Sequence, residues 1–179
     1  CFRRNIHYRN ILLPVLQKCN SVTKITNLYF LSHPLFEQFC IVAQILFDLG
    51  NDVSGYDDAQ AYKFTQKGLE ERGIEIFYDH EHPIDSDTIV TYSVAFSEDH
   101  PELVRVRNLG LKVKKYNELM GDVISMFKTI GVSGTHGKTT TSSIVRHILE
   151  ESVGCNYFIG AGDGYASLDN DYFVVESDE

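Results

Sequence analysis

Short apolar runs alternate with helical patterns along most of this 179-residue chain, and three helical patterns close at a glycine. Gly50, Gly73 and Gly110 stand where helix C-termini are expected. We expect strands over residues 28–31, 52–55, 74–77, 88–92 and 111–113, and helices over 39–49, 61–72, 101–109 and 117–126. This alternation through short loops predicts βαβ units and a parallel sheet, and therefore an α/β fold. The carboxyl ends of parallel strands share one edge of the sheet, where ligands bind.

A glycine-rich turn follows the next apolar run, at 129–132, and precedes a helical pattern that starts near Thr141. Its sequence is Gly134-Thr135-His136-Gly137-Lys138-Thr139-Thr140. Backbone N–H groups of such a turn wrap phosphate oxygens, and the helix N-terminus adds its positive dipole end. Lys138 is placed to reach the terminal phosphates of ATP or GTP, and the Thr139 hydroxyl is placed to ligate Mg²⁺.

The spacing of this turn departs from the pattern G-x-x-x-x-G-K-[ST], because Val132 stands where the first glycine is expected. A turn rich in glycine and threonine is also compatible with plain helix capping. The apolar run before it and the long helical pattern after it favour the phosphate interpretation.

The last apolar run, over 171–175, ends in acidic residues, of which Glu176 comes first. Carboxylates at the end of a strand downstream of a phosphate loop are where a nucleotide-bound Mg²⁺ finds a protein ligand. The alternative is that these acids only solvate a loop. Their occurrence together with Lys138 and Thr139 favours the metal role.

The first α/β unit has an acid, Asp57, after its second expected strand, at the distance typical of a ribose contact in dinucleotide-binding folds. The glycine-rich turn of those folds is absent, since residues 32–39 are bulky. The segment 93–96 follows another strand and is an ordinary strand-to-helix loop by itself. Three histidines, His80, His82 and His100, match no standard metal-site spacing, so we expect them to be surface residues.

Composition narrows the function classes. The formal net charge of −9 argues against a general nucleic-acid binder. No apolar run reaches membrane-spanning length. The four cysteines have no C-x-x-C spacing, which is typical of reduced thiols. We therefore expect a soluble, cytoplasmic protein with no membrane or nucleic-acid partner.

Together these motifs resemble the Mur ligase family over about residues 28–179. The residues that carry the resemblance are Gly134-Thr135-His136-Gly137-Lys138-Thr139-Thr140-Thr141, Val174-Val175-Glu176-Ser177-Asp178-Glu179, Val53-Ser54-Gly55-Tyr56-Asp57, Tyr92-Ser93-Val94-Ala95-Phe96 and Asp99-His100-Pro101-Glu102-Leu103. The resemblance implies a Rossmann-like N-terminal domain for a UDP-sugar, followed by the truncated start of a P-loop ATPase domain. It favours the branch that joins L-alanine to UDP-N-acetylmuramate in peptidoglycan synthesis, with ATP and Mg²⁺, through an acyl phosphate.

The resemblance also implies roles for individual residues. Residues 134–140 would bind ATP, with Lys138 as a catalytic residue on the β- and γ-phosphates. Thr139 and Glu176 would hold Mg²⁺, and Glu176 counts as catalytic through that role. The UDP-sugar contacts would be Asp57, Ser93 and Ala95.

By this comparison the chain divides into residues 1–26, which resemble nothing in the family, a UDP-sugar domain at 27–120, and the start of the ATPase domain at 121–179. We expect the segment up to about Phe39 to be partly aberrant, for instance read from a shifted frame. The rest of the central domain and the C-terminal domain would lie outside the chain, so we expect a catalytically inactive fragment. Alternatives are a non-catalytic nucleotide-binding module and a sister ligase that adds a preformed peptide to UDP-muramate.

Overall fold

The computed structural model describes residues 27–32, 36–58, 66–92, 96–160 and 162–177. The first sheet has five parallel strands in the order β3-β2-β1-β4-β5. Their bounds are β1 (Asn27–Ser32), β2 (Asp52–Asp57), β3 (Glu75–Phe77), β4 (Ile89–Tyr92) and β5 (Lys112–Lys115). All five expected strands and their parallel arrangement are confirmed. This strand order is that of dinucleotide-binding folds, with its switch point between β1 and β4.

Four helices accompany this sheet in the described residues: α2 (Phe36–Asp48), α3 (Lys67–Glu70), α4 (Pro101–Asn108) and α5 (Tyr116–Ile124). Glycines at the expected helix ends have positive φ, +88° at Gly50, +70° at Gly73 and +70° at Gly110. The start of α4 is fixed by His100, whose Nδ1 accepts a hydrogen bond from the Glu102 backbone N–H. Of the helix expected at 61–72, residues 61–65 lie outside the described residues, and the described part forms the short helix α3.

A second sheet follows, with strand order β6-β9-β7-β8. Its elements are β6 (Lys128–Val132), α6 (Lys138–Glu150), β7 (Asn156–Ile159), β8 (Asp163–Tyr165) and β9 (Tyr172–Glu176). β6, β9 and β7 run parallel, and β8 pairs antiparallel with β7. β6, α6 and β9 were expected from the sequence, whereas β7 and β8 were not.

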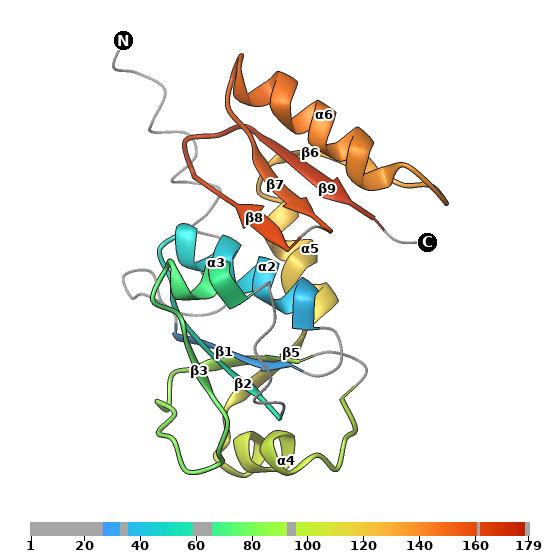
Figure 1. Cartoon of the computed structure of the whole chain (residues 1–179). Helices are drawn as coiled ribbons and strands as arrows, with labels where there is room; N and C mark the ends of the chain where they lie inside the picture. Colours follow the sequence, from blue (N-terminus) through green and yellow to red (C-terminus); the bar gives the residue numbers. More distant parts are fainter. Residues whose placement is uncertain (1–26, 33–35, 59–65, 93–95, 161, 178–179) are drawn as a thin grey trace.

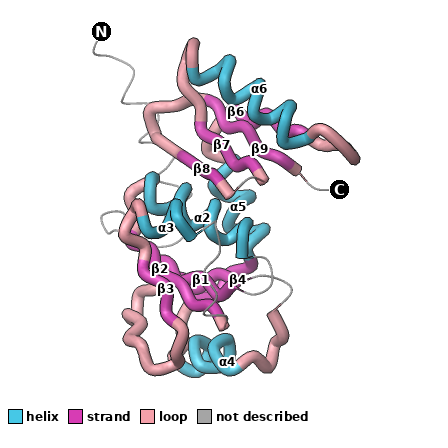
Figure 2. The backbone as a smooth tube through the Cα atoms, viewed as in Figure 1, coloured by secondary structure: helices cyan, strands magenta, loops and turns pink. Residues whose placement is uncertain are grey.

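The elements form alternating layers, which Figures 1 and 2 show from one side. α4 covers the outer face of the first sheet, and α2, α3 and α5 lie between the two sheets. α6 covers the outer face of the second sheet. Because α2 contacts both sheets, it has no broad polar face, and Phe39 through Leu46 are all nearly inaccessible to solvent.

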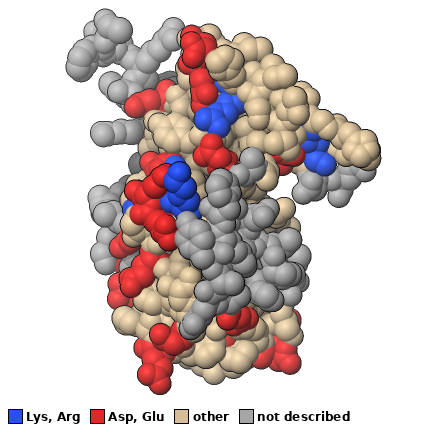
Figure 3. Space-filling view, in the orientation of Figure 1, with Lys and Arg blue, Asp and Glu red and all other residues tan. Residues whose placement is uncertain are grey.

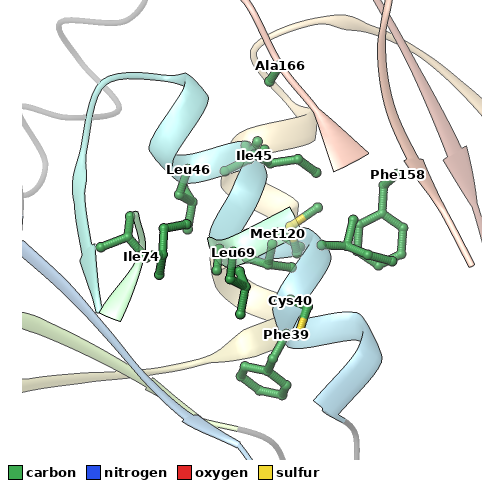
Figure 4. Packing of buried hydrophobic residues seen from close by; sticks show 14 of the residues in the cluster. Phe39, Cys40, Ile45, Leu46, Leu69, Ile74, Met120, Phe158 and Ala166 are labelled. Atoms are coloured by element: carbon green, nitrogen blue, oxygen red, sulfur yellow. The ribbon is translucent and has the colours of Figure 1, made fainter. Parts of the chain in front are cut away.

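The largest hydrophobic core lies around α2 and joins the two sheets (Figure 4). The cluster includes Ile45 and Leu46 of α2, Met120 of α5, Phe158 of β7 and Ala166, which follows β8. Burying large apolar side chains from both units in one cluster stabilises their relative placement.

The domain boundary expected between residues 120 and 121 falls inside α5, which packs on β4 and β5 of the first sheet. Asn27–Ser32, inside the segment expected to be partly aberrant, forms the central strand, where Tyr29 and Leu31 are buried. No helix in the described part of the chain is long and apolar enough to cross a membrane. On the face shown in Figure 3, acidic side chains are spread widely and basic ones occur at separate places.

Candidate functional site

The glycine-rich turn lies between the end of β6 and the start of α6, as the sequence predicts. Gly134 has a φ of +149° and Gly137, at the N-cap of α6, has a φ of +77°. Side-chain-bearing residues rarely adopt these values, so the two glycines allow the chain to turn sharply into the helix. The N-terminus of the 13-residue helix α6 then faces the turn with its unsatisfied N–H groups.

The residues around the turn differ in exposure. Thr135, His136 and Thr140 are exposed, whereas Lys138, the first residue of α6, is partly buried. No acidic residue occurs in the first turn of α6, so the positive end of its dipole is not neutralised there. The arrangement is therefore suited to an anion.

Thr139 and Glu176 are brought into direct contact. Thr139 Oγ1 donates a hydrogen bond to Glu176 Oε1 at 2.9 Å. The contact follows from the sheet, because β6 and β9 are parallel neighbours and Val132 pairs with Glu176. The turn after β6 and the last residue of β9 consequently share one edge.

The second carboxylate oxygen of Glu176 is also held. The Gly160 backbone N–H, directly after β7, donates to Glu176 Oε2 at 3.0 Å. Gly160 was not singled out from the sequence, since a glycine after an unrecognised strand gave no signal of its own. With both oxygens engaged, the Glu176 carboxylate has a defined orientation towards Thr139.

The donor set at this edge fits a hard cation such as Mg²⁺. Magnesium prefers oxygen ligands and is commonly bound through one carboxylate, a hydroxyl and substrate phosphates. Glu176 would supply the carboxylate and Thr139 the hydroxyl, next to the helix N-terminus that would receive phosphates. Among the described residues, this edge included, no group of three or more His, Cys, Asp or Glu side chains is arranged to hold a metal ion, so a cation here would depend on phosphate oxygens as further ligands.

The expected UDP-sugar residues are only partly described. Asp57 ends β2, is fully buried, and pairs in register with Ser32 at the end of β1. It therefore lies at the carboxyl edge of the first sheet, separate from the pair formed by Thr139 and Glu176 in the second. Ser93 and Ala95 lie outside the described residues.

The expectation that three histidines are surface residues is wrong for His82. Its side chain is 2% exposed and stacks on Phe77, with ring centroids 4.2 Å apart. His82 Nδ1 donates to the Asp79 carbonyl at 2.7 Å, and Nε2 lies 2.5 Å from the Tyr29 hydroxyl. Burial, followed by the charge of Glu102, raises the pKa of Tyr29 and keeps this phenol protonated.

The same cluster surrounds Glu102, which is fully buried in the first turn of α4. Its carboxylate accepts hydrogen bonds at 2.7 Å from Arg105 and from His80. A buried carboxylate of this kind is stable only when paired. The sequence could not place these groups together, because the contacts join β1, the loop after β3 and α4.

Comparisons with known proteins agree with this geometry. The model of the Mur ligase family, catalytic domain, matches residues 40–128. The UDP-N-acetylmuramate–L-alanine ligase of Lactiplantibacillus plantarum is 41% identical over 138 residues, which are 77% of this chain and 31% of that protein. The ligase of the same name from Pediococcus pentosaceus is 42% identical over 139 residues, with the same coverage. The chain thus spans about a third of the length of these curated relatives.

Solved structures of ligases with related names also align with this chain. The UDP-N-acetylmuramate–alanine ligase from Thermotoga maritima aligns with a TM-score of 0.70 at 25% identity, over 85% of this chain and 37% of that one. The UDP-N-acetylmuramate:L-alanyl-γ-D-glutamyl-meso-diaminopimelate ligase from Neisseria meningitides aligns at 0.68 and 21% identity, over 86% and 53%, and shows the shared fold. The strand order, the glycine-rich turn with its Thr139–Glu176 pair, and these relatives together show that the chain belongs to the Mur ligase family.

Proposed function

We propose that this chain is the UDP-sugar- and ATP-binding part of a ligase of peptidoglycan precursor synthesis that joins L-alanine to UDP-N-acetylmuramate. The reaction consumes ATP, forms an acyl phosphate on the muramate carboxylate, and yields an amide, ADP and phosphate after attack by the alanine amine. The observation that carries the proposal is the 2.9 Å contact between Thr139 and Glu176 beside the phosphate turn. Relatives more than 40% identical, whose names state this ligase activity, support the choice of substrates.

The chain's own residues have distinct tasks in this proposal. The N–H groups of the turn 134–137 and of the start of α6 bind the phosphates of ATP, together with the exposed Thr135, His136 and Thr140. Lys138 neutralises charge on the β- and γ-phosphates, and Thr139 and Glu176 hold Mg²⁺. The metal ion, when bound, supplies further neutralisation of the charge that develops on the transferred phosphoryl group.

The first sheet is proposed to bind UDP-N-acetylmuramate at the switch point between β1 and β4. Asp57 at the end of β2, with Ser93 and Ala95 after β4, would contact the nucleotide sugar. A ligase with these water-soluble nucleotide substrates is expected to act in the cytoplasm.

Binding titrations test the proposal on the chain itself. We expect UDP-N-acetylmuramate to bind and UDP-N-acetylglucosamine to bind more weakly, because the lactyl carboxylate is missing from the latter. Mg·ATP should bind weakly, since this chain spans 31% of the relatives' length. Lack of any muramate preference would favour a general nucleotide-binding module.

Catalysis is tested with a chimera in which residues 27–179 replace the matching part of the Lactiplantibacillus plantarum ligase. We expect phosphate release that requires ATP, UDP-N-acetylmuramate and L-alanine together, and none from the 179-residue chain alone. A folded chimera that binds both nucleotides without phosphate release would identify this part as a non-catalytic module. Phosphate release only with L-alanyl-γ-D-glutamyl-diaminopimelate as acceptor would identify the sister ligase.

A further inference from the structure

The connection between β7 and β8 contacts both units of the protein. It begins at Gly160, whose N–H holds Glu176 Oε2 in the second unit. Its Gly162 carbonyl accepts a hydrogen bond from Gln44 Nε2 of α2 at 3.3 Å. Within β8, the Gly164 carbonyl accepts one from Arg72 Nη2 at 3.2 Å. One short segment therefore lies between the proposed metal ligand and the first unit.

Arg72, which follows α3, uses all five of its N–H donors. Nε and Nη2 donate to the two carboxylate oxygens of Asp48, each at 2.9 Å. Nη1 donates to Gln44 Oε1 and to the Gly68 carbonyl, each at 3.0 Å, and Nη2 also donates to Gly164. A guanidinium with every donor engaged has one orientation, and only arginine offers this planar fork. The pKa of Arg72 is raised, first by its hydrogen bond to Asp48, so the group stays charged.

Gln44 completes this arrangement from the buried side. It is 1% exposed, and its two amide atoms have opposite tasks, since Oε1 accepts from Arg72 and Nε2 donates to Gly162. Gly68 makes room for it, because a Cβ at position 68 would lie 2.6 Å from the Gln44 amide. Close packing thus fixes Gln44, and Gln44 fixes the carbonyl of Gly162.

Close packing at Gly164 also holds β8 against α2. A Cβ at this position would lie 2.4 Å from Ile41 Cγ2 and 3.0 Å from the Ile41 carbonyl oxygen, so β8 touches α2 directly. On its other side, Asp163 accepts a hydrogen bond from Arg146 of α6 at 2.9 Å. The segment is therefore held by α2, by Arg72 and by the helix that begins at Lys138.

We propose that Arg72 and Gln44 are positioning residues for the phosphate site. They hold the carbonyls of Gly162 and Gly164, and through the nearby Gly160 N–H they orient the Glu176 carboxylate towards Thr139. The first unit thereby sets the geometry of the Mg²⁺ ligand in the second. The inference rests on the proposed function in that Glu176 is taken as the metal ligand, and hydrogen-bonded partners of metal ligands generally affect metal affinity.

Two measurements on the 179-residue chain test this inference, with Arg72→Ala and Arg72→Lys as variants. The first is the NMR hydrogen-exchange rate of the Gly160 amide, which reports its bond to Glu176 without nucleotide. We expect about tenfold faster exchange in Arg72→Ala. The second is the Mg²⁺ affinity in the presence of a non-hydrolysable ATP analogue, which should fall about tenfold, while binding of the metal-free analogue stays unchanged.

Arg72→Lys covers the case in which Arg72→Ala fails to fold. It keeps the charge beside Asp48 but lacks the fork that reaches Gly164, so it should show both effects more weakly. Lys67→Ala is the matched control, because Lys67 is exposed and its ion pair with Glu71, at 3.7 Å, is exposed too; both readouts should equal those of the wild type.

The outcomes separate the inference from the proposed function. Unchanged Gly160 exchange in a folded Arg72 variant overturns the inference whatever the nucleotide does. Faster exchange with unchanged Mg²⁺ affinity overturns it as well, since a merely structural role gives that result. If the wild type binds no Mg·nucleotide, the proposed function fails, and the Gly160 exchange rate then decides by itself whether Arg72 orients Glu176.

Discussion

The contact between β8 and α2 predicts a large penalty for a single methyl group at Gly164. An alanine Cβ there would lie 2.4 Å from Ile41 Cγ2, about 1 Å short of ordinary contact, which begins at 3.4 Å. It would also lie 3.0 Å from the Ile41 carbonyl oxygen and 3.2 Å from Ile45 Cδ1. A helix backbone cannot retreat cheaply from a buried contact, so the two sheets must separate slightly or the Ile41 side chain must leave its rotamer.

Overpacking of this kind costs about 1–3 kcal/mol. We expect Gly164→Ala to lower the free energy of unfolding by about 2 kcal/mol, which corresponds to a Tm about 4–8 °C lower for a chain of this size. Circular dichroism during thermal and urea unfolding measures both quantities. No positive φ is involved at this position, so the effect isolates steric crowding from backbone strain.

Gly121→Ala is the matched control. Gly121 is exposed within α5 and a Cβ there meets nothing within 4 Å, so alanine should stabilise the protein by about 0.5–1 kcal/mol. In the background of Ile41→Ala, which removes the crowding methyl group, the penalty of Gly164→Ala should shrink. Equal stability of Gly164→Ala and the wild type, or an unchanged penalty in that background, would refute the reasoning.

Three further predictions concern other parts of the protein. Lys138→Ala should weaken Mg·ATP binding at least about tenfold by loss of a charged phosphate contact, and equal affinities in an NMR titration would remove Lys138 from the site. Glu102→Gln breaks a buried ion pair and should lower the free energy of unfolding by about 3–5 kcal/mol. Glu98→Gln breaks an exposed pair with Arg107 and should change it by less than about 1 kcal/mol, so similar losses for both variants in urea unfolding would contradict the prediction. Burial raises the pKa of the Cys155 thiol to about 11, so its alkylation should be slow at pH 8 and faster as the pH approaches 11. Over the same pH range the free energy of unfolding should fall, because the thiol ionises at lower pH in the unfolded chain. Rapid alkylation of the folded protein at pH 8 would contradict the prediction.

The sequence was sufficient for much of the first sheet because a helix-ending glycine stands just before three of its strands, β2, β3 and β5. Gly50, Gly73 and Gly110 all have the positive φ that their positions predict. Adjacent parallel strands also made the meeting of Thr139 and Glu176 foreseeable, since the ends of β6 and β9 share an edge.

The second sheet was harder to predict for local reasons. β7 is buried at all four positions and shows no alternation, while β8 has three residues with Gly164 at its centre. Helix α6 begins three residues before the expected start because its polar residues bond within the helix. Ser142 Oγ donates to the Lys138 carbonyl at 2.9 Å and Ser143 Oγ to the Thr139 carbonyl at 2.7 Å, which satisfies hydroxyls that otherwise favour turns.

The buried histidine escaped prediction for a different reason. His82 lies in a polar loop segment, and its burial depends on Phe77 and on Tyr29 of a strand more than fifty residues earlier. Contacts between residues so far apart in the sequence form only in the folded protein, so local periodicity cannot predict them.

The order of strands in the second sheet also decides when the proposed phosphate site forms during synthesis. β6 pairs with β9, so Lys128 cannot form its strand pairing until Tyr172 has been synthesised, roughly 2–9 s later at about 5–20 residues per second. In that interval the glycine-rich turn has already been synthesised, but β6 has not yet paired with β9. Closing the β6–β9 ladder completes the sheet and delivers Glu176 to Thr139 in the same event. A nascent chain is therefore expected to acquire Mg·nucleotide affinity abruptly, as Glu176 emerges, and not gradually as the turn and α6 are made.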